Sequence, residues 1–369
     1  MTFRYIGSKS RVVHYLAPYI GQPTNAGGRF VDLFCGTGVV AECAAALGWD
    51  VWVNDNLHSA VTMATARVVD ECRVPFRSLG GYEAAVSLLN EVPPKQGFLW
   101  REYSPASIVH CGVERRYFTE DNAGRLDAMR AQLADWYHDG LLSELEHTVL
   151  VADLLSAANR AANIAGTYGC FLSKWQKQAF EPVRVIPRVF GISGCQVKAT
   201  VEDVFSVQVQ ENDVVYLDPP YTKRQYASYY HILETIALND EPEVQGVCGL
   251  RPWKEKASPF CYKRRALSAL INLIEQLPAN CILLSYSDEG HVDLGALADA
   301  LAVNGKLDVI PLKEIGRYRP NKTASANGSA VKEYLIRYTR NTRSSTNRKK
   351  EKNDELSVPI RRKVAQCTA

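Results

Sequence analysis

Four consecutive residues, DPPY at 218–221, combine side chains and backbone geometry that can hold an amino group for reaction. They follow the apolar run VVYL, which predicts a position at the carboxyl end of a buried strand, where open α/β sheets bind ligands. Pro219 and Pro220 stiffen the turn, so the Asp218 carboxylate and the free carbonyls of the turn share one small space. These acceptors can take both N–H bonds of an amino group and direct its lone pair at an electrophile. Tyr221 offers a flat face on which an extruded base can stack.

The segment DLFCGTG at 32–38 predicts a second half of the same site. Gly36 and Gly38 let the backbone turn sharply and approach a ligand, and the helix expected next offers free N–H groups. Asp55 falls at the end of the next apolar run, where an acidic residue can bind ribose hydroxyls, and Asp32 can meet a cationic group. The run GTGVVA lacks the third glycine of GxGxxG, so a nucleoside without phosphates, such as S-adenosylmethionine, fits better than a dinucleotide. A tight structural turn is the alternative.

Apolar runs that alternate with helical patterns must position these two segments. This alternation predicts an α/β fold with a Rossmann-like sheet that is mostly parallel and has helices on both faces. A long Gly/Asn/Ser-rich loop separates the last two runs, so they are expected to form an antiparallel edge. The expected strands are 29–34, 51–54, 197–201, 214–218, 281–287, 307–312 and 333–339, and the expected helices between the early strands are 39–47 and 58–71.

The alternation lapses between residues 72 and 195. Thr119 is expected to cap a helix that runs to about His138, and residues 141–163 form a second periodic segment. The sequence therefore predicts a catalytic domain made of 1–71 and 196–339, interrupted by a mainly helical insertion at 72–195. Residues 340–369 are rich in Lys, Arg, Ser and Asn and predict a basic flexible tail.

Composition narrows the class of protein. Hydrophobic residues make up 46% and charged residues 22%, which is typical of a soluble globular chain. No apolar run reaches the length of a membrane span or a signal peptide, so we expect no membrane partner. The 10 cysteines lack zinc spacing, which favours reduced thiols, a cytoplasmic location and no metal. The net charge of +3 comes from the tail, because residues 1–339 carry about −3, so any nucleic acid must bind through local patches.

Several motifs in one order carry a family resemblance. RYIGSK at 4–9, FVDLFCGTG at 30–38, VND at 53–55, VVYLDPPYTKRQY at 214–226 and ILLSYSDEG at 282–290 together resemble the Dam-type DNA adenine-N6 methyltransferases, in particular the branch found in restriction–modification systems. The resemblance covers roughly residues 3–338. It implies S-adenosylmethionine as methyl donor, no metal, double-stranded DNA as substrate and a cognate restriction endonuclease as a partner.

The resemblance also assigns roles by position. Asp218 and the Pro219 carbonyl would hold the adenine N6 amino group during direct transfer, within the catalytic turn that Pro220 and Tyr221 complete. The positions implied for cofactor binding are Tyr5 and Lys9 in the N-terminal motif, Phe34, Gly36 and Gly38 in the glycine motif, Asp55 at the ribose and Asp203 near the cofactor's adenine.

A target adenine inside a duplex must be flipped out at a cost of a few kcal/mol, which phosphate contacts can offset. Lys223 and Arg224, directly after the catalytic turn, are the predicted DNA-binding residues. The insertion is expected to read the bases. His231 is interpreted as a helix residue beside the site rather than a catalyst, and the stretch 165–175 as either a core loop or part of the site. Three further basic clusters are equally consistent with DNA contact or with a solvated surface: Arg115–Arg116, Lys174 with Lys177, and Lys263–Arg265.

Three alternatives stay open. The acceptor could be cytosine N4, although enzymes of that kind more often begin the catalytic turn with Ser. It could be adenine in RNA, which the sequence does not distinguish sharply from DNA. A protein of a different class, a non-catalytic DNA-binding subunit that keeps the fold, would not need the intact DPPY turn.

Overall fold

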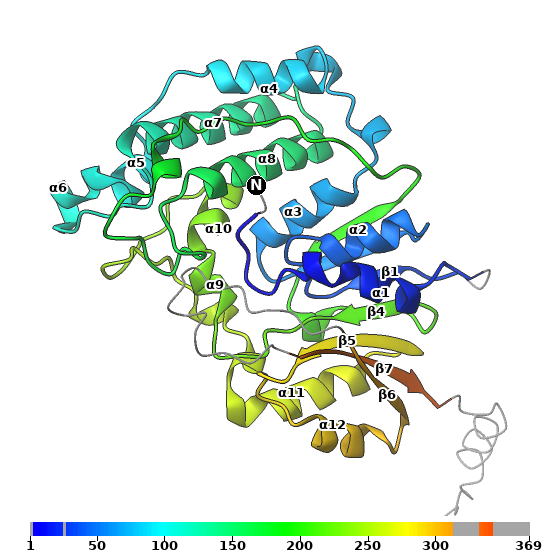
Figure 1. The fold of residues 1–369 in the computed structure, drawn as a ribbon. Coiled ribbons are helices and arrows are strands. Elements are labelled where there is room, and N and C mark those ends of the chain that lie inside the picture. The colour runs from blue at the N-terminus through cyan, green and yellow to red at the C-terminus, as the bar shows by residue number, and fades with distance from the viewer. Residues whose placement is uncertain (1–2, 25–26, 313–331, 342–369) are drawn as a thin grey trace, which may run out of the picture.

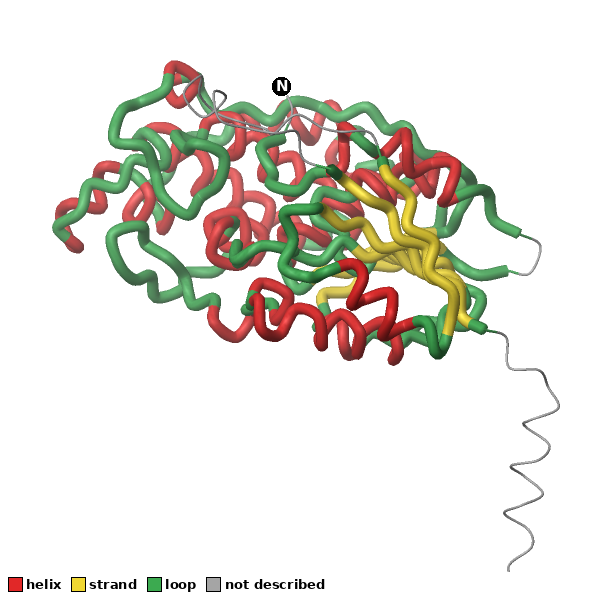
Figure 2. The backbone as a smooth tube through the Cα atoms, turned by 60° about the horizontal axis from the view of Figure 1, so that its bottom comes forward, coloured by secondary structure: helices red, strands yellow, loops and turns green. Residues whose placement is uncertain are grey.

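The structure is a computed structural model, and it describes residues 3–24, 27–312 and 332–341. Within these residues the strands form one twisted sheet in the order β3-β2-β1-β4-β5-β7-β6 (Figure 2). β1 to β5 run parallel, and β7 lies between β5 and β6 and runs antiparallel to both. The predicted fold class and its antiparallel edge are thus confirmed. The strands are β1 Phe30–Asp32, β2 Val51–Asp55, β3 Val197–Val201, β4 Val214–Leu217, β5 Cys281–Ser287, β6 Gly305–Pro311 and β7 Glu333–Arg340.

Helices cover both faces of the sheet (Figure 1). On one face lie α1 (Val13–Ile20), α2 (Val39–Ala46) and α3 (His58–Val68), which share an apolar core with the strands. On the other lie α11 (Lys263–Gln276) and α12 (Leu294–Leu301), with a second core. Among the described residues no helix is both long enough and apolar enough to cross a membrane.

Gly38 explains how closely α2 and α3 approach each other. It caps α2 with a left-handed backbone (φ 76°), a conformation that favours glycine. A Cβ added there would lie 2.5 Å from the Cα of Ala64 in α3, which is too close for any side chain. The glycine therefore sets the packing of the two helices as well as the turn that precedes them.

Residues 82–161 contain the helices of the predicted insertion. Thr119 does cap the helix that follows it, because its hydroxyl accepts the Asn122 N–H at 3.2 Å. Ser143 begins the next helix in a capping box with Glu146. The helices are α4 Tyr82–Glu91, α5 Phe98–Tyr103, α6 Ile108–Cys111, α7 Glu120–His138 and α8 Glu144–Ala161.

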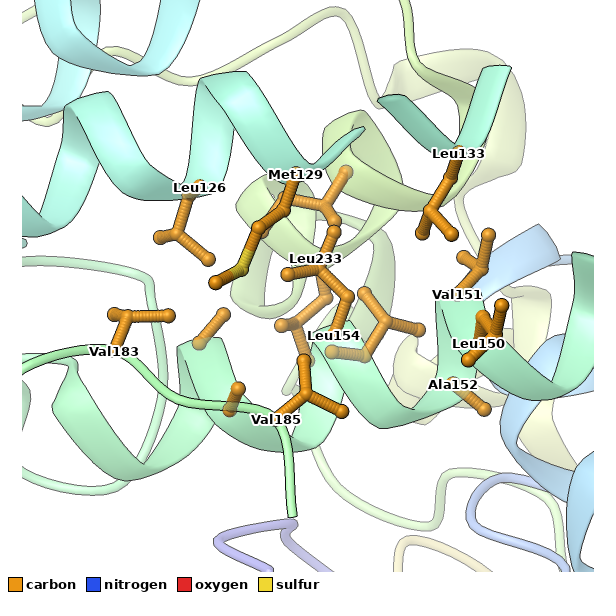
Figure 3. Packing of buried hydrophobic residues seen from close by; sticks show 14 of the residues in the cluster. Leu126, Met129, Leu133, Leu150, Val151, Ala152, Leu154, Val183, Val185 and Leu233 are labelled. Atoms are coloured by element: carbon orange, nitrogen blue, oxygen red, sulfur yellow. The ribbon is translucent and has the colours of Figure 1, made fainter. Parts of the chain in front are cut away.

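This helical region shares a core with the rest of the protein. α8 packs on α3 and on α10 (His231–Leu238), and α9 (Tyr226–Tyr229) leads into α10. Figure 3 shows Met129 of α7, Leu154 of α8 and Leu233 of α10 together in one apolar cluster. The boundaries proposed at 71 and 196 stay a prediction. The tail predicted from 340 lies outside the described residues after Asn341, and its first residue, Arg340, ends β7.

Candidate active site

A cavity of about 350 Å³ opens at the carboxyl ends of β1, β2 and β4. The two segments singled out in the sequence meet there, although 179 residues of chain separate them. The predicted site residues that line this cavity are Tyr5, Lys9, Asp32, Phe34, Asp55, Asp203, Asp218 and Pro220. The other residues predicted for the catalytic turn and the cofactor, Gly36, Gly38, Pro219 and Tyr221, do not line it.

Asp218 sits directly after β4 and forms an ion pair with Lys9. The distance from its Oδ1 to the Lys9 Nζ is 2.8 Å, and both side chains are largely buried. Burial raises the pKa of Asp218 to about 6, although the Lys9 charge opposes that rise. Burial alone would lower the pKa of Lys9, but Asp218 holds it well above the usual value. The pair is therefore charged at neutral pH.

Tyr221 does not face the cavity as an open platform. Its ring packs against Tyr286, with centroids 5.6 Å apart, and its hydroxyl donates to Glu333 Oε1 at 3.4 Å. The other oxygen of Glu333 lies 3.8 Å from the Lys9 Nζ. Glu333 was not predicted from the sequence, because it reaches the site only through the pairing of β7 with β5.

Asp32 and Asp55 supply the acidic lining near the glycine turn. Asp55 accepts the N–H groups of Gly36 and Leu57, at 3.2 and 3.1 Å, and burial raises its pKa to about 6. Asp32 is only 1% exposed, and burial raises its pKa well above the usual value. Among the described residues its Oδ1 has no hydrogen-bond partner. A buried acceptor of this kind fits a donor group from a ligand.

Aromatic rings form the wall beside Asp203. Phe260 meets Phe34 edge-on, with centroids 5.6 Å apart, and stacks on Phe205 at 5.9 Å. The Asp203 carboxylate accepts the Phe205 N–H at 2.9 Å, so its position in the wall is fixed. Phe205 and Phe260 were not predicted from the sequence. Phe205 follows directly on a predicted site residue and could have been found, whereas nothing local marks Phe260.

The wall that contains Phe260 is tied to the segment after the catalytic turn. Gln225 and Ser258 exchange two hydrogen bonds, at 3.3 and 2.9 Å, and the Cys261 thiol donates to the Arg224 carbonyl at 3.2 Å. Lys256, in the same wall, pairs with the buried Glu234 at 2.9 Å.

Glu234 also fixes the start of α3. It accepts the N–H groups of His58 and Ser59, at 3.0 and 2.9 Å. Burial would raise its pKa, but the contacts with His58, Lys256 and Ser59 lower it to about 2. This carboxylate therefore stays charged and holds two parts of the cavity rim together.

The structure also locates several other residues that were considered in the sequence. Lys223 and Arg224 are exposed, directly beyond the catalytic turn. His231 is a helix residue, as interpreted: it is fully buried, its Nε2 lies 2.9 Å from the Tyr168 carbonyl, and burial lowers its pKa to about 3. In the stretch 165–175 only Tyr168 is buried, in the main apolar cluster, and none of its residues lines the cavity.

Arg115 corrects one interpretation. It is neither a solvated side chain nor available to DNA, because it is 3% exposed and pairs with Glu102 at 2.8 Å. Its guanidinium also donates to the carbonyls of Gly246 and Val247. Its neighbour Arg116 pairs with Glu114. The sequence could not distinguish a basic surface pair from this arrangement, because the partners of Arg115 come from distant segments.

Comparison with known proteins identifies the family. The family described as D12 class N6 adenine-specific DNA methyltransferase matches residues 5–289. The chain belongs to this family. The resemblance inferred from the motifs is therefore confirmed, and membership implies S-adenosylmethionine as methyl donor.

Curated relatives are named as type II methyltransferases and modification methylases. Type II methyltransferase M.FokI of Planomicrobium okeanokoites is 37% identical over 78% of this chain and 45% of its own length. Modification methylase StsI of Streptococcus sanguinis is 32% identical over 83% of this chain and 47% of its own. The chain thus spans about half the length of these two relatives. It spans 95% of type II methyltransferase M.NlaIII of Neisseria lactamica, with 30% identity over 88% of this chain.

Proposed function

We propose that this D12-class protein methylates the N6 amino group of adenine in double-stranded DNA, as the modification enzyme of a restriction–modification system. The observation that carries the proposal is the position of Asp218, whose carboxylate enters the same cavity as Asp32 and Asp55. A cognate endonuclease and a cytoplasmic location belong to the same proposal. The expectation that no metal takes part stays a prediction.

The residues of the cavity fit S-adenosylmethionine. Asp55 lines the cavity and would accept ribose hydroxyls, and the unpartnered Oδ1 of Asp32 would accept the ammonium group of the amino-acid part. The rings of Phe205 and Phe260 offer an apolar wall for the adenine. When bound, the cofactor supplies a methyl group activated by a sulfonium.

The chain's own residues then orient the acceptor. The Asp218 carboxylate takes one N–H of the target amino group and the Pro219 carbonyl takes the other, which aims the nitrogen lone pair into the cavity. As the new N–C bond forms, the bond between the methyl carbon and the sulfur would break and leave the sulfur as a neutral thioether. The nitrogen becomes positive, and the negative Asp218 beside it stabilises that charge. The nitrogen then loses a proton easily, so Asp218 need not be a strong base.

Two exposed basic segments flank the catalytic turn and are proposed to contact DNA phosphates. Lys223 and Arg224 follow the turn, and Lys263–Arg265 begin α11. The bonds between Gln225 and Ser258 and between Cys261 and Arg224 hold these segments side by side. The double substitution Lys223→Ala with Arg224→Ala is expected to weaken duplex binding and to reduce the salt slope of binding by about one to two. An unchanged slope, measured by titration at several salt concentrations, would remove these residues from the interface.

One experiment tests the proposed reaction. Labelled S-adenosylmethionine is incubated with the protein and duplex DNA, and the modified nucleoside and its sequence context are identified. We expect N6-methyladenine from the natural protein, no transfer from Asp218→Asn, and retained duplex binding in both. Label in N4-methylcytosine, or transfer only to RNA, would contradict the substrate. DNA binding without any transfer would favour a non-catalytic subunit.

A further inference from the structure

Asn54, the middle residue of the VND motif, borders the cavity although it is completely buried. It lies in β2, directly before Asp55, and its side chain is 0% exposed. A buried amide is costly unless its oxygen and both of its N–H bonds find hydrogen-bond partners. The partners of Asn54 therefore indicate what the residue does at the edge of the cavity.

The amide of Asn54 pairs with both backbone groups of Glu202, the residue directly after β3. Its Oδ1 accepts the Glu202 N–H at 3.2 Å, and its Nδ2 donates to the Glu202 carbonyl at 3.1 Å. Oδ1 also accepts the Thr200 hydroxyl at 2.8 Å, and Nδ2 makes a longer contact of 3.5 Å with the Leu33 carbonyl. Both acceptor sites and both N–H bonds are thus engaged within the chain, so this amide acts on its neighbours rather than on a ligand.

These bonds extend the order of the sheet beyond the end of its edge strand. The backbone pairing of β2 with β3 ends where Asp55 lies in register with Val201. Past that point the Asn54 side chain replaces the missing strand partner of Glu202. The residue before Asp203 is thereby bonded to the residue before Asp55. One buried amide consequently sets the spacing of the two carboxylates, which both line the cavity.

We propose that Asn54 is a positioning residue that fixes Asp55 and Asp203 at the distance needed to bind the two ends of the cofactor's nucleoside. This inference rests on the proposed function, in which Asp55 binds the ribose. Asp203 accepts the N–H of Phe205, whose ring belongs to the wall proposed for the adenine. A nucleoside is stiff, so two acceptors that bind it together must be held apart by a constant distance. A displacement of either acceptor weakens its hydrogen bond.

The test compares Asn54→Ala with Asn122→Ala. Asn122 is a matched control, because it is 2% exposed and forms the same kind of clamp in the helical region. Its Nδ2 donates to the carbonyls of Ala179 and Glu181, at 2.9 and 3.0 Å, and its Oδ1 accepts the Val183 N–H at 2.8 Å. Calorimetric titration measures the affinity for S-adenosylhomocysteine, the cofactor without its methyl group. Asn54→Ala should lower this affinity by roughly 10-fold, whereas Asn122→Ala should bind like the natural protein.

Two readouts separate this role from mere support of the fold. With saturating cofactor, the single-turnover rate of Asn54→Ala should stay within about threefold of the natural rate, because Asp218 follows β4, on the far side of β1. The second readout is selectivity for the base of the cofactor. The natural protein should prefer S-adenosylhomocysteine to S-inosylhomocysteine, in which an oxygen replaces the amino group that Asp203 would accept. Asn54→Ala should lose most of this preference, and Asn122→Ala should keep it.

The outcomes are distinct. Natural affinity and selectivity in a folded Asn54→Ala would overturn the proposal, and so would equal losses in Asn54→Ala and Asn122→Ala. A slow rate at saturating cofactor with intact affinity would also count against it. If Asn54→Ala does not fold, Asn54→Ser, which keeps one hydrogen-bonding group, is measured in its place. The titrations need no DNA, so a protein that binds the nucleoside as expected but methylates no adenine would refute the proposed function and leave this inference standing.

Discussion

Buried carboxylates are treated differently in the helical region and in the cavity. In the helical region, Asp127 of α7 accepts the N–H groups of Gly97, Leu99 and Trp100, and it also pairs with Arg130 at 3.2 Å. It thereby caps the first turn of α5 from a neighbouring helix. No acceptor position of this carboxylate is left open for a ligand.

Two carboxylates in or near the cavity are incompletely satisfied. Asp32 and Glu333 each have one buried oxygen without a hydrogen-bond partner among the described residues. Such oxygens cost stability, since their desolvation is not repaid within the chain. The comparison indicates that Asp127 uses its buried charge to fix the fold, whereas Asp32 keeps one acceptor oxygen open for a group from a ligand. The following substitutions test this distinction, beginning with the largest expected effect.

Among these substitutions, Asp127→Ala should reduce the stability of the fold most. The substitution leaves three backbone donors and the buried Arg130 without their acceptor, which should lower the free energy of unfolding by about 3–5 kcal/mol. Chemical denaturation measures this loss. Methyl transfer per folded molecule should persist, because Asp127 lies outside the cavity lining. A stable but inactive variant would contradict the assignment of Asp127 to the fold.

Asp32→Asn should have the opposite pattern of effects, with stability kept and ligand binding weakened. Burial already disfavours the charged carboxylate, and the substitution replaces it with a neutral amide of the same shape, so the free energy of unfolding should stay the same or rise. Affinity for the cofactor should fall by roughly 10- to 100-fold, the loss expected for one hydrogen bond to a charged group. Calorimetric titration and thermal melting of the same preparation give both numbers. Lower stability together with unchanged affinity would assign Asp32 to the fold.

The smallest expected effect is a pH dependence that distinguishes two carboxylates of the cavity. Burial raises the pKa values of Asp218 and Asp55 to about 6, so both lose their charge below that pH. Protonated Asp218 accepts the amino group poorly, and the rate at saturating cofactor should fall about tenfold per pH unit below 6. Protonation of Asp55 should instead weaken cofactor binding. A rate that is flat down to pH 5 would exclude Asp218 as the charged acceptor.

The sequence predicts what depends on local pattern. The strands at 197–201 and 281–287 match to the residue, because apolar runs bounded by turn residues mark both ends. The cap at Thr119 is also a local signal. The assembly of DPPY with the glycine turn follows from a rule of parallel sheets, which places strand ends at one edge.

What the sequence could not predict depends on contacts between distant segments. Glu333 reaches Lys9 only because β7 inserts between β5 and β6, and its own neighbourhood in the chain resembles any strand end. Phe260 reaches the cavity through the bonds between Gln225 and Ser258. Nothing in the sequence near Arg115 distinguishes it from a surface residue. In the structure, a carboxylate 13 positions away and a remote loop enclose its side chain.

The two hydrogen bonds between Gln225 and Ser258 have a kinetic consequence. They join the segment proposed to contact the DNA to the segment that forms the wall for the cofactor's nucleoside. Neither segment can move away alone without breaking both bonds. We therefore expect the spent nucleoside to leave only after the DNA has gone. Turnover on successive sites of one long DNA would then require a dissociation event each time.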